Sequence, residues 1–165
     1  LDAMARNCPV IGHCLGGQLM ARALGAAVGP SPAPEVGWHD ITPAANAEAQ
    51  AWFGDAHTLT VFQWHEEAFA LPVGAAALAG NAACTYQAFA IGPHLAMQFH
   101  VEVDEEKLTR WSMLDTAAYR AQQQRHTTVQ GGRTLREAMP RHLPAQQALA
   151  DRIYARWWSR ASPSG

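Results

Sequence analysis

At 165 residues, 48% of them hydrophobic, the chain is long enough for one globular domain with a real core and too short for a second large domain. The formal net charge is -2 and the basic residues are scattered, so the sequence contains no basic patch for binding nucleic acid or an anionic membrane surface. Three cysteines without a Cys-x-x-Cys pair, and no signal-like or membrane-spanning apolar run, favour the reducing cytoplasm. We therefore predict a single cytoplasmic domain over residues 1–165. Small neutral or zwitterionic molecules remain possible substrates.

The first predicted elements surround a cysteine. Leu1–Arg6 is predicted to be the end of a helix, and Val10–Ile11 the core of a buried, central strand. Leu15–Leu24 is predicted to be a helix that stops at Gly25. Cys14 therefore lies between a strand and a helix, where the chain has to turn sharply.

Two glycines frame this turn and make it a candidate nucleophile elbow. Gly12 and Gly16 lie two positions on either side of Cys14 and are expected to leave space for a strained backbone. The N-terminus of the following helix favours the thiolate, which is the form that attacks a carbonyl. Cys8 and Cys84 lack such framing, and we expect both to be ordinary, non-catalytic cysteines.

The middle of the chain is predicted to contain a loop, two strands and a helix. Pro30–Pro34 is expected to be an irregular surface loop, and Glu35–Ile41 an outer strand. Ala47–Phe53 is predicted to be a short helix. Leu59–Phe62 is β-branched and aromatic and is predicted to be a strand, with Gln63–Glu67 at its C-terminal end, where such folds bind ligands.

The last third is predicted to begin with two strands and to end in helices. The strands Gln87–Ile91 and Leu95–Phe99 are joined by a tight turn at Gly92–Pro93. Acidic residues from Asp104 onwards open a helix, whose apolar positions are Leu108, Trp111, Leu114 and Ala118. A glutamine-rich stretch and Gly131–Gly132 then break the pattern. A closing helix that docks on the domain is predicted from the spacing of Leu149, Ile153 and Trp157, so that 104–161 forms a helical extension.

His100 and Glu102 are candidates for the base that takes the Cys14 proton and for the carboxylate that orients this base. Residues two apart in an extended segment point to the same side, so Glu102 can orient the His100 imidazole, whose other nitrogen can take the thiol proton. The remaining histidines outside this pattern and the middle motif are expected to be ordinary core or surface residues: His13, His39, His57, His94, His126 and His142.

Metal and phosphate sites are not predicted. His65 is followed by two glutamates but not by the second histidine that a zinc-protease helix needs, and no Cys or His pair has zinc-finger spacing. Neither Gly16–Gly17 nor Gly131–Gly132 ends in the Gly-Lys-Ser/Thr of a P-loop. We expect no metal and no cofactor.

Three motifs in this order resemble the class I (triad-type) glutamine amidotransferases. They are Gly12-x-Cys14-x-Gly16-x-Gln18, Gln63-Trp64-His65-Glu66-Glu67 and Phe99-His100-Val101-Glu102. The resemblance covers residues 9–102 and is closest to stand-alone proteins similar to the amidotransferase domain of GMP synthase. It implies an α/β fold, a flavodoxin-like three-layer sandwich with a mixed, mostly parallel sheet flanked by helices.

The resemblance also implies roles for individual residues. It implies a catalytic triad of Cys14, His100 and Glu102, and an oxyanion donor at the Leu15 backbone N–H. Glutamine contacts are implied from Gln18 and from the backbone near Trp64 and His65. Family members also have early strands and a second oxyanion donor. Because Cys14 comes so soon after Leu1, we expect that N-terminal part of the fold to be absent from this chain.

Three functions follow as hypotheses. The first is a glutaminase that releases ammonia from glutamine through a cysteine thioester, for an acceptor on a separate synthetase polypeptide. The second is a γ-glutamyl peptide or amide hydrolase with the same triad, because the same acyl-enzyme forms whichever amine departs. The third is a regulatory or binding subunit that keeps the fold without chemistry.

Overall fold

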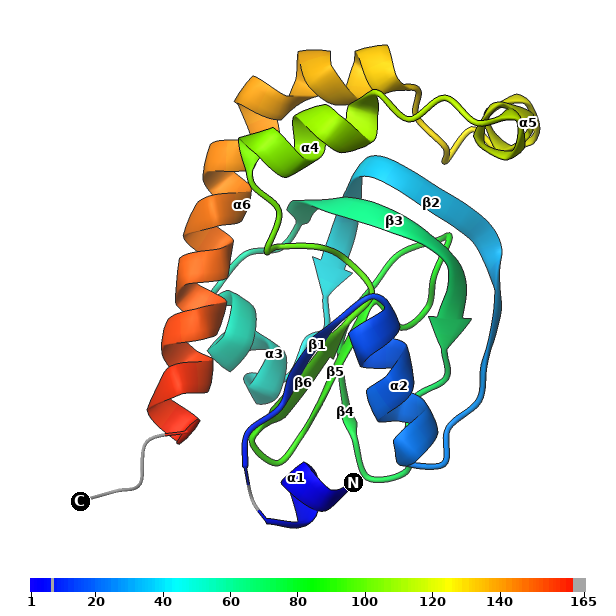
Figure 1. Cartoon of the computed structure of the whole chain (residues 1–165). Coiled ribbons are helices and arrows are strands. Elements are labelled where there is room, and N and C mark those ends of the chain that lie inside the picture. Colours follow the sequence, from blue (N-terminus) through cyan, green and yellow to red (C-terminus); the bar gives the residue numbers. More distant parts are fainter. Residues whose placement is uncertain (7, 162–165) are drawn as a thin grey trace.

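The computed structural model describes residues 1–6 and 8–161. In chain order its elements are α1 (Asp2–Ala5), β1 (Ile11–His13), α2 (Leu15–Ala23), β2 (Val28–Pro43), α3 (Ala47–Phe53), β3 (Leu59–Phe69), β4 (Ala76–Gly80), β5 (Ala88–Ile91), β6 (His94–Met97), α4 (Glu105–Ser112), α5 (Ala117–Arg125) and α6 (Gly132–Ala161). Figure 1 shows how they are arranged, with the long β2–β3 ribbon on one side of the molecule and α6 on the other.

The six strands form one sheet in the order β1-β6-β5-β4-β2-β3. The sheet is mixed and flanked by helices, which confirms the predicted architecture. The predicted parallel majority does not hold for these strands, because β1–β6 is parallel and the other described pairs are antiparallel. The connections explain this. The chain passes from β2 to β3 and from β5 to β6 without crossing over the sheet, and strands joined in this way run antiparallel.

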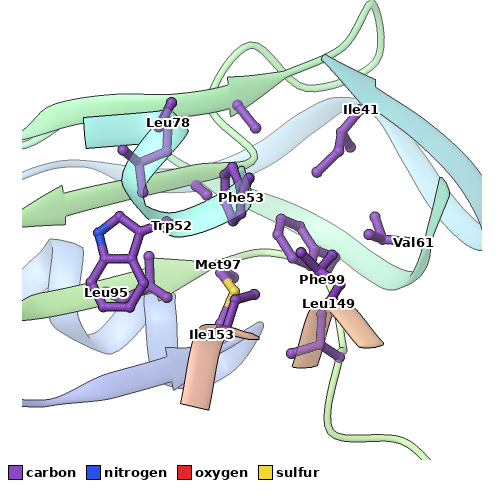
Figure 2. Close-up of a cluster of buried hydrophobic side chains, with 14 of the residues drawn as sticks. Ile41, Trp52, Phe53, Val61, Leu78, Leu95, Met97, Phe99, Leu149 and Ile153 are labelled. Atoms are coloured by element: carbon purple, nitrogen blue, oxygen red, sulfur yellow. The ribbon is translucent and has the colours of Figure 1, made fainter. Parts of the chain in front are cut away.

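Helices cover both faces of the sheet and make it a three-layer structure. Alternate residues of β6 face opposite layers, as the pleat requires. Leu95 and Met97 lie in the large core cluster with α3 and α6, which Figure 2 shows around Trp52 and Ile153. Ala96, between them, lies in the cluster under α2.

The closing helix that the apolar spacing predicted is present as α6, and it docks as expected. Leu149 and Ile153 are buried in the large core cluster, and Trp157 packs against it. The guanidinium of Arg156 lies 4.9 Å from the ring centroid of Trp52 on α3, so α3 and α6 are also joined by a cation–π contact. The helix bends in its first half, near Pro140 and Pro144 (Figure 1), where proline removes backbone hydrogen bonds.

Pro30–Pro34 was expected to be an irregular loop, but this segment lies inside β2. The segment is extended but is not regularly paired with β3. The register shifts between Pro30 and Glu35, so Ser31–Pro34 bulges out opposite Glu66. Prolines cannot donate to a ladder, which is why pairing breaks here while the backbone stays extended.

Two further elements differ from the sequence prediction. β3 runs to Phe69, so the predicted ligand-binding end of the strand lies within a long ribbon paired with β2. β4 was not predicted, because its sequence is mostly alanine, which has a low β-propensity. It forms a strand because it pairs with both β2 and β5.

The predicted helix from Asp104 is shorter than its apolar pattern suggested. The Asp104 side chain caps α4 by accepting from the Lys107 N–H, but the helix ends at Ser112 and Leu114 is 47% exposed. The glutamine-rich stretch, expected to break the pattern, forms α5, which is capped by Thr116. A capping side chain outweighs a weak apolar pattern there.

The strand before Cys14 lies at one edge of the sheet, although its apolar character suggested a central position. Among the described residues, β1 pairs with β6 alone. No helix within the described ranges has the length and apolar character needed to span a membrane.

Candidate active site

Cys14 stands at the turn between β1 and α2, where the backbone is strained. With φ 46° it is the one non-glycine residue in the described chain that has a positive φ, a conformation that costs about 1–3 kcal/mol. It caps the N-terminus of α2, and its own N–H donates to the Met97 carbonyl of β6 at 2.8 Å. The half-buried thiol therefore lies at the positive end of the α2 dipole.

The two framing glycines have different roles. A Cβ built on Gly12 would lie 2.6–2.7 Å from backbone atoms of Gly16 and Gly17, closer than any real contact. A Cβ on Gly16 would meet nothing within 4 Å. The expectation that both glycines leave space for the turn therefore holds for Gly12, and Gly16 is sterically free.

His100 follows β6 directly, and the sheet and α6 anchor it. Its N–H donates to the Phe62 carbonyl at 2.8 Å, while the Phe62 N–H donates to Oε1 of Gln146 on α6 at 2.7 Å. Nδ1 of His100 lies 2.6 Å from Oε1 of Glu102, and the Cys14 side chain interacts with the same imidazole. The structure thus brings the three residues of the predicted triad together, with His100 interacting with both Cys14 and Glu102.

The two ionisable partners stabilise each other's charge. Burial lowers the pKa of His100, but its hydrogen bonds to Cys14 and Glu102 outweigh burial and raise the pKa to about 9. Burial raises the pKa of Glu102, yet the hydrogen bond and the charge of His100 bring it down to about 2. At neutral pH the imidazole is therefore charged and the carboxyl is ionised.

Aromatic side chains hold the His100 ring in place. Trp111 of α4 meets the imidazole edge-on, with 5.2 Å between ring centroids, and Trp64 meets Trp111 at 5.3 Å. Tyr119 of α5 stacks on Trp64, and the Lys107 ammonium lies 4.8 Å from the Trp111 centroid. The helical extension therefore supplies one wall of the site, which sequence reasoning had treated as a docking element alone.

The residues predicted to contact the substrate or to stabilise the oxyanion include Trp64, Leu15 and Gln18. The Trp64 carbonyl lies 3.5 Å from Sγ of Cys14, so this part of the β3 backbone borders the thiol. Leu15 is the first residue of α2, where backbone N–H groups have no acceptor within the helix. Gln18 is buried, and its amide already donates to the Glu67 carbonyl at 3.0 Å.

The His65 side chain belongs to a buried polar network behind the thiol. Its Nδ1 lies 3.0 Å from the Glu67 carbonyl, and its Nε2 lies 3.1 Å from Oε2 of Glu35. Asn81 and Gln87 also donate to the Glu35 carboxylate, at 2.7 and 2.5 Å. Burial raises the pKa of Glu35, but these hydrogen bonds bring it below its ordinary value, so the carboxylate is charged and fully partnered.

His13 was expected to be an ordinary histidine, and the structure places it beside the predicted triad. Its Nδ1 lies 3.3 Å from Oε2 of Glu102, and its Nε2 lies 3.0 Å from the hydroxyl of Tyr154 on α6. Lys107 is 3.7 Å from the other carboxylate oxygen. The sequence contained one signal for His13, its position next to Cys14.

The other two cysteines lie outside this site. Cys8 is exposed, and Cys84 is buried, which raises its pKa to about 12. A search of residues 1–6 and 8–161 for groups of three or more His, Cys, Asp and Glu side chains able to hold a metal ion finds none.

Three curated relatives match part of the chain. The glutamine amidotransferase-like protein YfeJ of Salmonella typhimurium is 38% identical over 112 residues, 63% of this chain and 46% of its own. One subunit of the glutamine-hydrolyzing GMP synthase of Ignicoccus hospitalis is 36% identical over 98 residues, 58% of this chain and 51% of its own. Gamma-glutamyl peptidase 3 of Arabidopsis thaliana is 32% identical over 115 residues, 66% of this chain and 45% of its own. The chain thus spans about half the length of these relatives.

The fold comparison agrees with the sequence comparison. The crystal structure of a glutamine amido transferase from Methylobacillus flagellatus superposes with a TM-score of 0.88 at 30% identity, over 99% of this chain and 68% of that one. The family model of class-I glutamine amidotransferases matches residues 1–113, which contain the Cys14 turn, the β2–β3 ribbon and His100–Glu102. The chain belongs to the class I glutamine amidotransferase family.

Proposed function

We propose that this protein is a cysteine hydrolase that cleaves the side-chain amide of glutamine, with Cys14, His100 and Glu102 as a catalytic triad. The observation that carries the proposal is the position of Cys14, strained at the N-terminus of α2 and interacting with His100, whose Nδ1 lies 2.6 Å from Oε1 of Glu102. A structural cysteine needs neither the strain nor the charged imidazole.

The geometry supports a two-step mechanism. The Cys14 thiolate attacks the amide carbon, and the oxygen that becomes negative is stabilised by the Leu15 backbone N–H at the start of α2. His100 gives its proton to the departing amine, which is released as ammonia. A γ-glutamyl thioester remains on Cys14. His100 then takes a proton from water, the hydroxide opens the thioester, and glutamate is released as the thiol is restored.

A γ-glutamyl peptide or amide is the second candidate substrate. It is favoured by the 32% identity to the gamma-glutamyl peptidase from Arabidopsis thaliana, beside the 36% identity to a GMP synthase subunit. The acyl-enzyme would be the same, and only the leaving amine would differ. If glutamine is the substrate, the ammonia passes to an acceptor on a separate synthetase polypeptide.

The test is to measure glutamate release from glutamine and from a panel of γ-glutamyl amides and dipeptides, with ammonia assayed in parallel. Cys14→Ala is expected to abolish turnover while the fold persists, and Cys8→Ala is the matched control that keeps full activity. His100→Ala should lose nearly as much as Cys14→Ala, because nucleophile and base act as one unit.

The proposal is refuted if Cys14→Ala keeps substantial activity. It is also refuted if the wild-type chain turns over none of the compounds and a glutamine-like diazo-ketone modifies no cysteine. That second result favours a binding or regulatory protein that keeps the fold.

A further inference from the structure

His13 and Tyr154 extend the active site beyond Glu102. The Glu102 carboxylate uses Oε1 for His100, and its other oxygen, Oε2, faces Nδ1 of His13 at 3.3 Å. Nε2 of His13 in turn lies 3.0 Å from the Tyr154 hydroxyl. His13 of β1 therefore lies between Tyr154 of α6 and Glu102 in the turn after β6.

This arrangement leaves one nitrogen of His13 dependent on Glu102. Nδ1 is buried and, within the described part of the chain, makes no hydrogen bond; Oε2 of Glu102 lies 3.3 Å from it, and the Phe99 backbone also interacts with the His13 ring. Leaving a buried donor unpaired costs about 1–3 kcal/mol, which pulls Oε2 and Nδ1 together. Without His13, Oε2 would lose this contact, and the carboxylate would keep the contacts of Oε1 with His100 and Lys107.

The proton on His13 has a defined position. A bare Nδ1 facing a carboxylate would set two lone pairs against each other, so a neutral imidazole carries its proton on Nδ1. Nε2 then accepts a hydrogen bond from the Tyr154 hydroxyl. Two shifts agree with this assignment: burial lowers the pKa of His13, which keeps it neutral, and burial raises the pKa of Tyr154 to about 12, which keeps the hydroxyl protonated.

We propose that His13 and Tyr154 are positioning residues for the triad: Tyr154 holds His13 in the Nδ1–H tautomer, and His13 fixes the Glu102 carboxylate that orients His100. The proposal rests on the proposed triad. It gives α6 a part in the site, because the hydroxyl of Tyr154 comes from the same face of the helix that carries Ile153 and Trp157 to the core.

The test uses side chains that imitate one nitrogen of His13 at a time. The amide nitrogen of Asn takes the place of Nδ1, and that of Gln takes the place of Nε2. Tyr154→Phe removes only the hydroxyl, and Tyr86→Phe is the matched control, since it removes the hydroxyl of a tyrosine that packs in the cluster under α2.

The readout is the rate at which iodoacetamide alkylates Cys14 in mildly acidic buffer, measured by mass spectrometry. This rate depends on the Cys14–His100 pair and on no substrate, so it stays informative if the proposed substrate is wrong. His13→Gln and Tyr154→Phe should each slow alkylation about five- to tenfold, the value of one neutral hydrogen bond. His13→Asn and Tyr86→Phe should stay within about twofold of wild type.

A double substitution separates positioning from general loss of stability. Asn has no tautomers, so Tyr154→Phe should have little further effect in the His13→Asn background. The proposal is overturned if His13→Gln and Tyr154→Phe, with cooperative thermal unfolding retained, alkylate as fast as wild type. It is equally overturned if Tyr154→Phe slows the His13→Asn protein as much as it slows the wild type.

Discussion

Replacing Gly12 by alanine tests whether close backbone approach, and not merely the presence of two glycines, shapes the Cys14 turn. The added Cβ would lie 2.6–2.7 Å from three backbone atoms of Gly16 and Gly17, none of which can rotate away. Overpacking costs about 1–3 kcal/mol, and rigid backbone places Gly12→Ala at the upper end, about 3 kcal/mol. For a chain of this size, that lowers the thermal midpoint by about 6–12 °C.

Gly16→Ala is the matched control, because its Cβ meets nothing within 4 Å and the residue lies inside α2. Removing a helical glycine stabilises by about 0.5–1 kcal/mol, so its midpoint should rise by about 1–4 °C. Both variants are followed by far-UV circular dichroism during heating. If the two variants melt at the same temperature, or if Gly12→Ala melts with the wild type, the steric explanation of the turn is wrong.

Three further predictions concern charge, reactivity and packing. The Glu102–His100 pair should stabilise the fold fully between pH 4.5 and 6.5, because the folded pKa values of about 2 and about 9 bracket the ordinary ones; its contribution should fade as pH drops toward 2 or rises through 9. The check is the midpoint of wild type minus that of Glu102→Gln across pH, and a difference independent of pH would contradict it. Iodoacetamide should alkylate Cys14 before exposed Cys8, and buried Cys84 last; equal rates at the three thiols, seen by peptide mass, would count against the activated thiolate. Ile153→Ala should cost about 2–5 kcal/mol in urea unfolding, since Ile153 is fully buried, whereas exposed Asp151→Ala should stay within about 0.5 kcal/mol; similar losses would show that α6 is not docked as described.

The sequence predicted most elements because their patterns are local. The α3 bounds, the turn between β5 and β6 and the stop of α2 near Gly25 follow from helix and turn chemistry within a few residues. Elements that depend on neighbours were missed or shortened. β4 is alanine-rich and becomes a strand through its two partner strands, and Ser31–Pro34 stays extended because β3 runs alongside.

The sequence also predicted a catalytic triad, through Cys14 between two glycines and the i, i+2 spacing of His100 and Glu102. Those signals are readable because strand alternation and the strand-to-helix turn fix the directions of side chains over short distances. The roles of Gln18 and His65 were harder to predict. Gln18 donates to the Glu67 carbonyl, and His65 contacts Glu35, and both are contacts between distant segments that no local spacing predicts.

By itself, then, the sequence determined the class of fold and the residues predicted to form the triad, since both depend on patterns within a few turns or strands. The tertiary structure alone decided what surrounds that triad. Trp111 reaches His100 from α4, and Tyr154 reaches His13 from α6, across 141 positions of sequence. The physical reason is that burial and hydrogen bonding act through space: His13 is an ordinary neighbour of Cys14 until folding brings Glu102 to one of its nitrogens and Tyr154 to the other.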